Sequence, residues 1–263
     1  MHLKRLVVAA VLLPLLYLYI MYLTPKYFIF LLIIMSVVAL SEFYAMYRVA
    51  GIFRFSGIFF GILILCTFYL SRGFLFNIII YFVMTLAAMR LFFKKDPRGS
   101  LYDTSIPVFG LLYIPGLLTF QAYIREIGPE WIILLYASVW AADSMAYYTG
   151  TFIGKTKLYV EVSPNKTVAG AVGSLIGGVL GVVVMKYTLI PVLTASSVFI
   201  IGIMIGAITV VGDLVESMFK RDAGVKDSGI IIPGHGGILD KLDGALFAGP
   251  VLFWLIITIK VIR

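Results

Sequence analysis

The chain has 263 residues, of which 62% are hydrophobic and 13% are charged, and its mean hydropathy is +1.06. This composition excludes a soluble globular protein, because the apolar side chains far exceed what one core could bury. The formal net charge is +8, which we attribute to membrane topology and anionic lipid headgroups and not to nucleic-acid binding.

Apolar runs of about 20 residues, the length that crosses a ~30 Å hydrocarbon core, recur along the chain. Nine are predicted, at 6–23, 27–47, 55–71, 74–93, 105–124, 129–149, 167–187, 198–219 and 244–262. Continuous apolar character is typical of membrane helices, whereas barrel strands alternate. The first run follows Lys4 and Arg5, as a signal peptide would, but it lacks a small-x-small cleavage site, so we expect a retained helix. The predicted fold is an all-α polytopic membrane protein.

The basic residues indicate how these helices are oriented. If the N-terminus is cytoplasmic, 15 Lys and Arg residues fall on the inner side and 6 on the outer side. This bias obeys the positive-inside rule. The sequence therefore predicts an integral protein of the inner (cytoplasmic) membrane, with the charge-rich segment 217–243 facing the cytosol.

The polar chemistry is unevenly distributed along the chain. Residues 1–128 hold five predicted helices with short loops, where we expect scaffold, lipid or dimer contacts. Residues 129–263 are predicted to form a catalytic region with cytosolic loops, and eight of the thirteen acids lie from Asp143 onward. The single cysteine, Cys66, lies within an apolar run, which favours a buried thiol without a metal or redox role.

Two of the later apolar runs contain glycines four residues apart. They are Gly173, Gly177 and Gly181 in one run, and Gly202 and Gly206 in another. This spacing is typical of membrane helices that approach each other closely, so we expect a packing function.

Four acids lie within or at the edge of apolar runs, where an acid costs about 2.5–3.5 kcal/mol at a helix centre and so faces protein, water or a cation. They are Glu42, Asp143, Asp213 and Glu216. Glu42 has no clustered partner in the sequence, which favours a structural or interfacial group. Asp213, Glu216 and Lys220 share one helical face. A Glu216–Lys220 pair at a solvated helix end would explain Glu216, but it would not explain Asp213 one turn deeper.

A second pair of acids, Asp240 and Asp243, precedes the last apolar run on one helical face. Two such carboxylates can bridge divalent cations. The glycine-rich turn before them can form an anion-binding concavity from successive N–H groups. The nearby basic residues are Lys220, Arg221 and Lys226. Together the pattern indicates a site for cations and a polyphosphate.

The spacing of these residues resembles the signature of the CDP-diacylglycerol synthases, also called phosphatidate cytidylyltransferases. The matching positions are Ser217, Lys220, Arg221, Lys226, Asp227, Gly229, Pro233, His235, Gly236, Gly237, Asp240 and Asp243. Lys241 stands where the family usually has Arg, which keeps the charge but loses a bidentate fork. A second matching block comprises Asp143, Tyr147, Gly150, Gly154, Lys155, Ser163, Pro164, Lys166, Thr167 and Gly170. In that block Asn165, Val168 and Ala169 replace the usual Lys, Trp and Glu.

The resemblance implies transfer of the cytidylyl group of CTP to phosphatidic acid, which gives CDP-diacylglycerol and pyrophosphate for phospholipid synthesis. It also implies a homodimer and Mg²⁺, alone or with a second cation. On this hypothesis the metal is held by Asp213, Asp240 and Asp243, with Asp227 as an additional ligand. Lys166, Lys220, Arg221 and Lys226 would neutralise phosphates, and Ser163, Thr167, Gly236 and Gly237 would donate hydrogen bonds. Asp143 is a further substrate-binding candidate. His235 is a donor to phosphate or nucleotide, a structural loop residue or a metal ligand, and the last is the least favoured because hard cations prefer oxygen.

Three other functions are weighed against this one. CTP-dependent polyprenol kinases look similar but transfer the γ-phosphoryl group, so product analysis separates them. A cation-coupled transporter could use the intramembrane acids, but it predicts inverted repeats, and the sequence has no convincing repeat. The CDP-alcohol phosphotransferase motif needs two further acids downstream, and no acid follows Asp243.

Overall fold

The computed structural model describes residues 14–70, 72–229 and 236–258, and these residues are mainly helical. Residues 14–22 form a helix. The elements that follow are α2 (Pro25–Met46), α3 (Gly51–Leu70), the short 3-10 helix η1 (Arg72–Phe74), α4 (Leu75–Phe93), α5 (Ser100–Leu111), the π-helical turn η2 (Leu112–Gly116), α6 (Leu117–Ile127), α7 (Pro129–Ile153), β1 (Lys157–Tyr159), β2 (Ser163–Thr167), α8 (Val168–Thr188), α9 (Ala195–Asp222) and α10 (Leu239–Thr258). The predicted all-α membrane fold is thus confirmed, apart from the antiparallel β1–β2 hairpin.

Seven helices of the described part of the chain are long and apolar enough to cross a membrane. They are α2, α3, α4, the continuous path from α5 to α6, α8, α9 and α10. The 25-residue helix α7 is not among them, and it carries polar side chains that include Glu130 and Asp143. The count of nine spans and the cytoplasmic N-terminus stay predictions.

The path from α5 to α6 was predicted as one span, and it is continuous but irregular. Pro107 lies inside α5, and Pro115 lies inside the π-helical turn η2. Proline has no N–H and its ring crowds the preceding turn. A π turn accommodates such a break without ending the helix.

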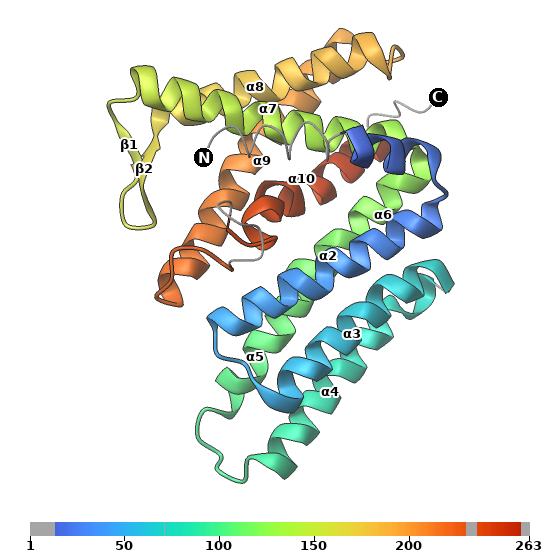
Figure 1. The fold of residues 1–263 in the computed structure, drawn as a ribbon, viewed down its shortest axis with the longest axis vertical. Helices are drawn as coiled ribbons and strands as arrows, with labels where there is room; N and C mark the ends of the chain where they lie inside the picture. Colours follow the sequence, from blue (N-terminus) through green and yellow to red (C-terminus); the bar gives the residue numbers. More distant parts are fainter. Residues whose placement is uncertain (1–13, 71, 230–235, 259–263) are drawn as a thin grey trace.

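Helix α8 packs against both α7 and α9, and its glycines make this possible (Figure 1). A Cβ atom on Gly177 would collide with the backbone of Ala141 in α7. On the other side, a Cβ atom on Gly206 of α9 would collide with the backbone of Ser174. Ser174 Oγ also donates a hydrogen bond to the Gly206 carbonyl at 2.9 Å. The packing function predicted for the glycine series is confirmed.

One hydrophobic core joins the two predicted parts of the chain. Fully buried residues come from helices on both sides of residue 128: Leu32 (α2), Leu118 (α6), Ile132 (α7), Ile201 (α9) and Leu246 (α10). A smaller cluster, which includes Phe82 and Leu86, joins α3 and α4. Cys66 of α3 is a half-buried free thiol. The division of function between 1–128 and 129–263 stays a prediction.

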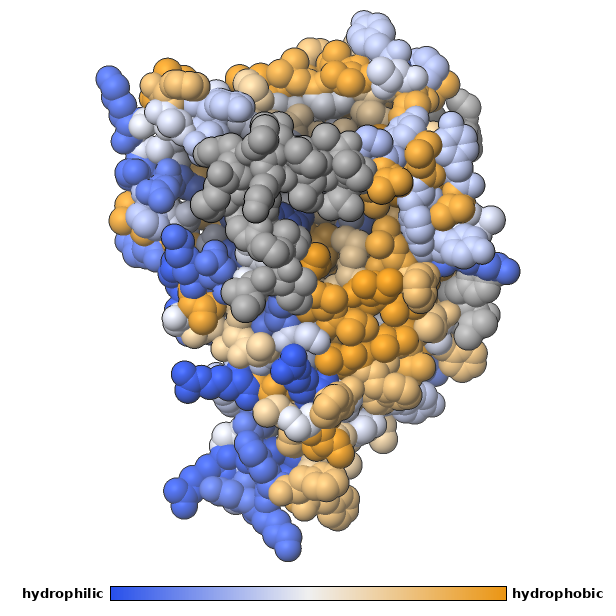
Figure 2. All heavy atoms as spheres, in the orientation of Figure 1, coloured by the Kyte–Doolittle hydropathy of each residue, from blue (hydrophilic) through white to orange (hydrophobic). Residues whose placement is uncertain are grey.

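Polar residues gather along one edge of the molecule. In Figure 2 hydrophilic residues follow the left and lower-left edge, where Figure 1 places the β1–β2 hairpin, the C-terminal end of α9 and the loop between α4 and α5. Hydrophobic residues cover much of the centre and right of this face. The polar loops of the two halves therefore share one edge, as expected if they face one aqueous compartment.

Candidate active site

A cavity of about 800 Å³ lies between α7, α8, α9, α10 and the hairpin. Seven of the predicted site residues line it: Asp143, Lys166, Thr167, Asp213, Lys220, Asp240 and Asp243. The structure therefore brings together residues from both sequence blocks, which are up to 100 positions apart. The cavity is lined in addition by Glu216, Lys157 and Lys241.

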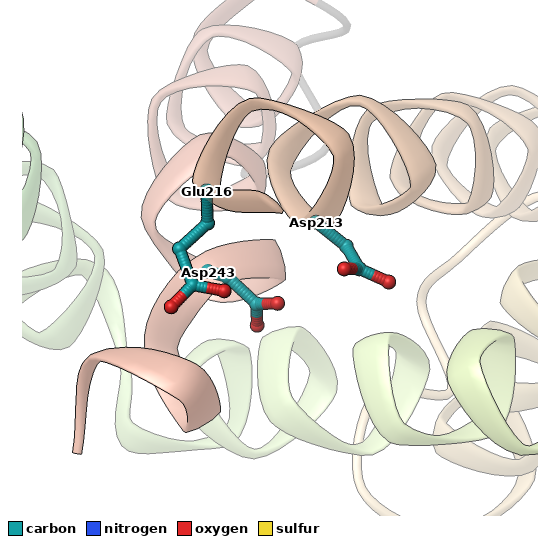
Figure 3. A group of neighbouring side chains, drawn as sticks. All are labelled: Asp213, Glu216 and Asp243. Carbon is teal, nitrogen blue, oxygen red and sulfur yellow. The ribbon is translucent and has the colours of Figure 1, made fainter. Parts of the chain in front are cut away.

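Three carboxylates converge on this cavity. Asp213 and Glu216 project from α9 and Asp243 projects from α10, and one oxygen of each lies within 4.8 Å of the others (Figure 3). The two helices approach closely at Gly212, where a Cβ atom would collide with the backbone oxygen of Asp243. We call Asp213, Glu216 and Asp243 the open carboxylates. They offer oxygen ligands, which Mg²⁺ prefers.

Glu216 is the member that the sequence assigned least firmly. Its side chain is 1% exposed, and Oε2 lies 2.8 Å from Lys220 Nζ. Its other oxygen, Oε1, is buried and has no hydrogen-bond partner among the described residues. The Glu216–Lys220 pair exists, but the idea of a solvated helix end is wrong because the pair is buried. An unpartnered buried carboxylate oxygen fits a metal ligand, since buried charge needs compensation.

Asp240 faces a different set of partners. Its carboxylate lies 2.7 Å from Lys220 Nζ, and it accepts hydrogen bonds from the Ser228 N–H, the Ser228 hydroxyl and the Gly237 N–H at 3.1, 3.0 and 2.7 Å. These donors hold the segment before α10 against the first turn of that helix. Asp240 lies outside the group of open carboxylates, and its function as a metal ligand stays a prediction.

Glu42 of α2 also binds the segment before α10. Its side chain is 5% exposed, and it accepts hydrogen bonds from the Ser228 hydroxyl at 3.3 Å and from the N–H groups of Ile238 and Leu239 at 3.0 and 2.9 Å. The first N–H groups of a helix lack intrahelical partners, so a carboxylate there is stabilising. The structural function predicted for Glu42 is confirmed. We call Glu42 and Asp240 the bonded carboxylates.

The basic residues of the cavity are divided among these acids. Lys166 of β2 lies 2.6 Å from Asp213, and Lys220 contacts both Glu216 and Asp240. Arg221 does not line the cavity; its guanidinium donates to the carbonyl oxygens of Val162 and Val225 at 3.3 and 3.4 Å. It therefore ties the end of α9 to the hairpin.

The remaining predicted residues lie outside the set that lines the cavity. Lys226 and Asp227 are exposed, and Ser163 is half-buried in β2. Gly236 has φ +88°, a left-handed conformation that favours glycine, and the Gly237 amide, predicted to bind phosphate, donates to Asp240. His235 lies outside the described residues.

Thr167 begins α8 at the edge of the cavity. Its hydroxyl oxygen accepts a hydrogen bond from the Gly170 N–H at 3.1 Å, so it caps a 21-residue helix. Asn165, Lys166, Gly170 and Ala171 line the cavity around the same helix end. A helix N-terminus is electropositive, so this end of α8, with Lys166 beside it, is suited to bind a phosphate.

The fold and the cavity define a class: a polytopic helical membrane protein whose polar edge holds a site suited to cations and phosphates. The chain belongs to the cytidylyltransferase family, whose model matches residues 3–259.

Several similar proteins carry the name phosphatidate cytidylyltransferase. One from Synechocystis sp. is 45% identical over 129 residues, which cover 48% of this chain and 42% of that protein. One from Staphylococcus haemolyticus is 39% identical over 161 residues, 61% of this chain and 62% of that protein. One from Haemophilus influenzae is 41% identical over 169 residues, 60% of this chain and 57% of that protein. The matched region thus spans about half of these relatives' lengths, and the resemblance predicted from the motifs is confirmed.

Proposed function

We propose that this protein transfers the cytidylyl group of CTP to phosphatidic acid and so forms CDP-diacylglycerol and pyrophosphate. The observation that carries this function is the cavity in which the open carboxylates meet four lysines, Lys157, Lys166, Lys220 and Lys241. The name that the relatives share supports the identity of the two substrates.

Electrostatics favours a cation in this site. Both substrates are polyanions, and the cavity itself is lined by five carboxylates and four lysines. If all are ionised, the lining has one excess negative charge and repels a triphosphate. We propose that Asp213, Glu216 and Asp243 hold Mg²⁺. Asp240 is a further candidate ligand, and a second cation is a further candidate occupant of the site. When bound, Mg²⁺ supplies charge neutralisation at the phosphoryl oxygens.

The reaction needs no protein nucleophile. An oxygen of the phosphatidic acid monoester attacks the α-phosphorus of CTP, the bond from this phosphorus to the oxygen that bridges it to the β-phosphorus breaks, and pyrophosphate leaves. A phosphate monoester is mostly ionised at neutral pH, with a second pKa of about 6. The protein therefore supplies orientation and charge: Lys166 and Lys220 stabilise phosphoryl oxygens, and the Thr167 hydroxyl hydrogen can be donated into the cavity.

The α8 N-terminus is our candidate for the triphosphate of CTP. Lys166 and Thr167 stand beside it, and the helix dipole makes this end electropositive, while the N–H groups of Val168 and Gly170 are donated to Thr156 and Thr167. The proposed site faces the cytosol, which the positive-inside bias and the shared polar edge support. A homodimer is part of the proposal; light scattering of the purified protein in detergent tests it.

Two labelled forms of CTP test the reaction. Purified protein is incubated with phosphatidic acid, Mg²⁺ and either α- or γ-labelled CTP. We expect the α label to become organic-extractable and the γ label to stay aqueous as pyrophosphate. Transfer of the γ label to lipid would identify a kinase instead. Ion-driven uptake by proteoliposomes without CTP consumption would identify a transporter.

A further inference from the structure

A second cavity, of about 320 Å³, lies beside the polar one. Its walls come from the helix at 14–22 and from α2, α7 and α10, and they include Leu16, Ile20, Phe28, Leu31, Met35 and Leu242. Its size falls within the range of ligand pockets, about 300–1,000 Å³. The lining is apolar almost throughout, because the hydroxyl of Tyr136 is already donated to Gln121 at 2.7 Å.

The two cavities share part of their lining. Trp140 of α7 and Lys241 of α10 line both. Among the residues that the structure describes, Lys241 is the only charged one that lines the apolar cavity. The side chain of Lys241 makes no ion pair or hydrogen bond with any residue that the structure describes, whereas Lys166 and Lys220 are both paired with acids. Lys241, which has no hydrogen bond or ion pair with a described residue but interacts electrostatically with Asp143, therefore stands at the junction of an apolar and a polar space.

We propose that the apolar cavity binds an acyl chain of phosphatidic acid while Lys241 binds the phosphate monoester of the same molecule. This inference rests on the proposed function and names the residues that hold its lipid substrate. An amphiphile with a dianionic head needs adjoining apolar and cationic surfaces, and the junction at Lys241 supplies both. A lysine ammonium is a compact point charge, which suits a monoester without requiring a planar fork.

The same arrangement separates the two substrates. Lys166 and Thr167 line the polar cavity but not the apolar one, so the hairpin and the α8 N-terminus are left for CTP. The lipid phosphate at Lys241 then enters the polar cavity from the side of α2 and α10. The open carboxylates line the polar cavity together with both groups of residues, as an attack of one phosphate on the other requires.

Filling the apolar cavity tests the acyl site. Leu31→Trp places an indole in the cavity, whereas Ile34→Trp lies on the exposed face of the same helix. We expect Leu31→Trp to raise KM for dioleoyl phosphatidic acid about tenfold, the effect of withdrawing roughly two methylene groups from an apolar site. KM for CTP and KM for dihexanoyl phosphatidic acid should not change, nor should any constant of Ile34→Trp. An equal rise for the short-chain lipid would overturn the assignment.

Removing the charge tests the phosphate contact. We expect Lys241→Gln to raise KM for both long- and short-chain phosphatidic acid by about tenfold or more, because a charge-assisted hydrogen bond is lost. KM for CTP should stay the same, and Lys241→Arg should restore lipid binding. A change confined to KM for CTP would instead assign Lys241 to the nucleotide.

Photocrosslinking tests the site without turnover, so it remains informative if cytidylyl transfer fails or Leu31→Trp does not fold. Wild-type protein is irradiated with phosphatidic acid or phosphatidylcholine that carries a diazirine at the end of one acyl chain. We expect phosphatidic acid to label peptides from α2 that contain Leu31 and Met35, and Lys241→Gln to abolish this labelling. Equal labelling by phosphatidylcholine would indicate an ordinary bilayer lipid, and that result, like no labelling, would overturn the proposal.

Discussion

The open and the bonded carboxylates are side chains of the same types, but they differ in their hydrogen-bond partners. All five lie on helices with apolar flanks, but Glu42 accepts hydrogen bonds from three donors and Asp240 from four, counting the N–H and hydroxyl of Ser228 separately. Glu216 instead keeps one oxygen without a partner. Buried polar groups are normally satisfied, so an unpartnered carboxylate oxygen that lines the cavity is suited to bind a ligand. The hydrogen-bond donors around each carboxylate, and not its residue type, distinguish the structural carboxylates from the proposed metal ligands.

Lys220 connects the two groups. It contacts Glu216 at 2.8 Å and Asp240 at 2.7 Å, and Asp240 shares Ser228 with Glu42 of α2. A helix of the N-terminal half thus helps to fix the first turn of α10, from which Asp243 projects. The comparison therefore predicts that changes to the open carboxylates alter chemistry, and that changes to the bonded ones alter the fold of the site.

The largest expected effect is that of Asp243→Asn. The substitution keeps the shape but weakens a ligand of the proposed Mg²⁺, whose stabilisation of transition-state charge amounts to several kcal/mol. We expect turnover of α-labelled CTP to fall about 10³-fold, since each 1.36 kcal/mol is a factor of ten. The thermal midpoint without Mg²⁺ should not fall, because fewer like charges remain together.

Asp240→Asn is the matched control for Asp243→Asn. It should lower the thermal midpoint, because Lys220 loses one of its two acidic partners in a mostly buried network. Near-normal turnover in folded Asp243→Asn protein would remove that residue from the metal site. If Asp240→Asn lost activity but kept its thermal midpoint, Asp240 would be assigned to the chemistry, together with the open carboxylates.

A smaller effect is expected from Mg²⁺ on the protein without substrates. A ligand that binds only the folded state at 100 times its Kd stabilises that state by about 2.7 kcal/mol. We expect Mg²⁺ to raise the thermal midpoint of the wild type and of Asp240→Asn. In Asp243→Asn the rise should be much reduced. An equal rise in all three proteins would show that the cation binds elsewhere.

Glu42→Gln is expected to have a smaller effect than the preceding changes. One carboxylate oxygen becomes an amide NH₂ that faces the N–H and hydroxyl donors of the loop, and an unsatisfied buried group costs about 1–3 kcal/mol. We expect a lower thermal midpoint with turnover reduced in proportion to the unfolded fraction. Asp96→Asn is the control, since Asp96 is 64% exposed and surface changes stay within about ±0.5 kcal/mol. An unchanged midpoint in Glu42→Gln would show that the three hydrogen bonds do not hold the loop.

Much of the fold could be predicted from the sequence, because bilayer length and close helix contacts leave local signals. The apolar runs and the glycine series of α8 and α9 were of this kind. The β1–β2 hairpin could not be predicted in the same way. Its strands have three and five residues, which is too short for a periodic pattern. Their pairing, in which Lys157 of β1 lies opposite Thr167 of β2, appears only after folding.

The site was predicted only in part, for a similar physical reason. Spacing along one helix placed Asp213, Glu216 and Lys220 on one face, but it could not decide which acid of α10 turns toward them. Asp240 and Asp243 are three residues apart and look equivalent in sequence. Their difference depends on Ser228 and on Gly237, whose donors engage Asp240. Glu42 carried one signal, an acid in an apolar run, but its partners lie 186 to 197 positions away.

The smallest expected effect compares two lysines of the sequence motifs. Lys166 lines the cavity beside Asp213, whereas Lys226 lies exposed in the segment after α9. The Lys166–Asp213 pair is 22% and 37% exposed and Nζ of Lys166 is buried, so Lys166→Gln should lower the thermal midpoint only slightly. Its KM for CTP should rise about tenfold, because one charge-assisted contact to phosphate is lost.

Lys226→Gln should change neither KM nor the midpoint if the described geometry is the one in which CTP binds. A rise in KM for CTP as large as that of Lys166→Gln would mean that the segment after α9 moves to the cavity when the nucleotide arrives. The position of Lys226 in the sequence motif would then reflect a closed arrangement in which Lys226 contacts the triphosphate. In that case the hydrogen bonds of Glu42 and Asp240 would change when substrate binds, because the same segment carries Ser228, which donates to both of them. Their classification as bonded carboxylates would then hold only for the protein without CTP.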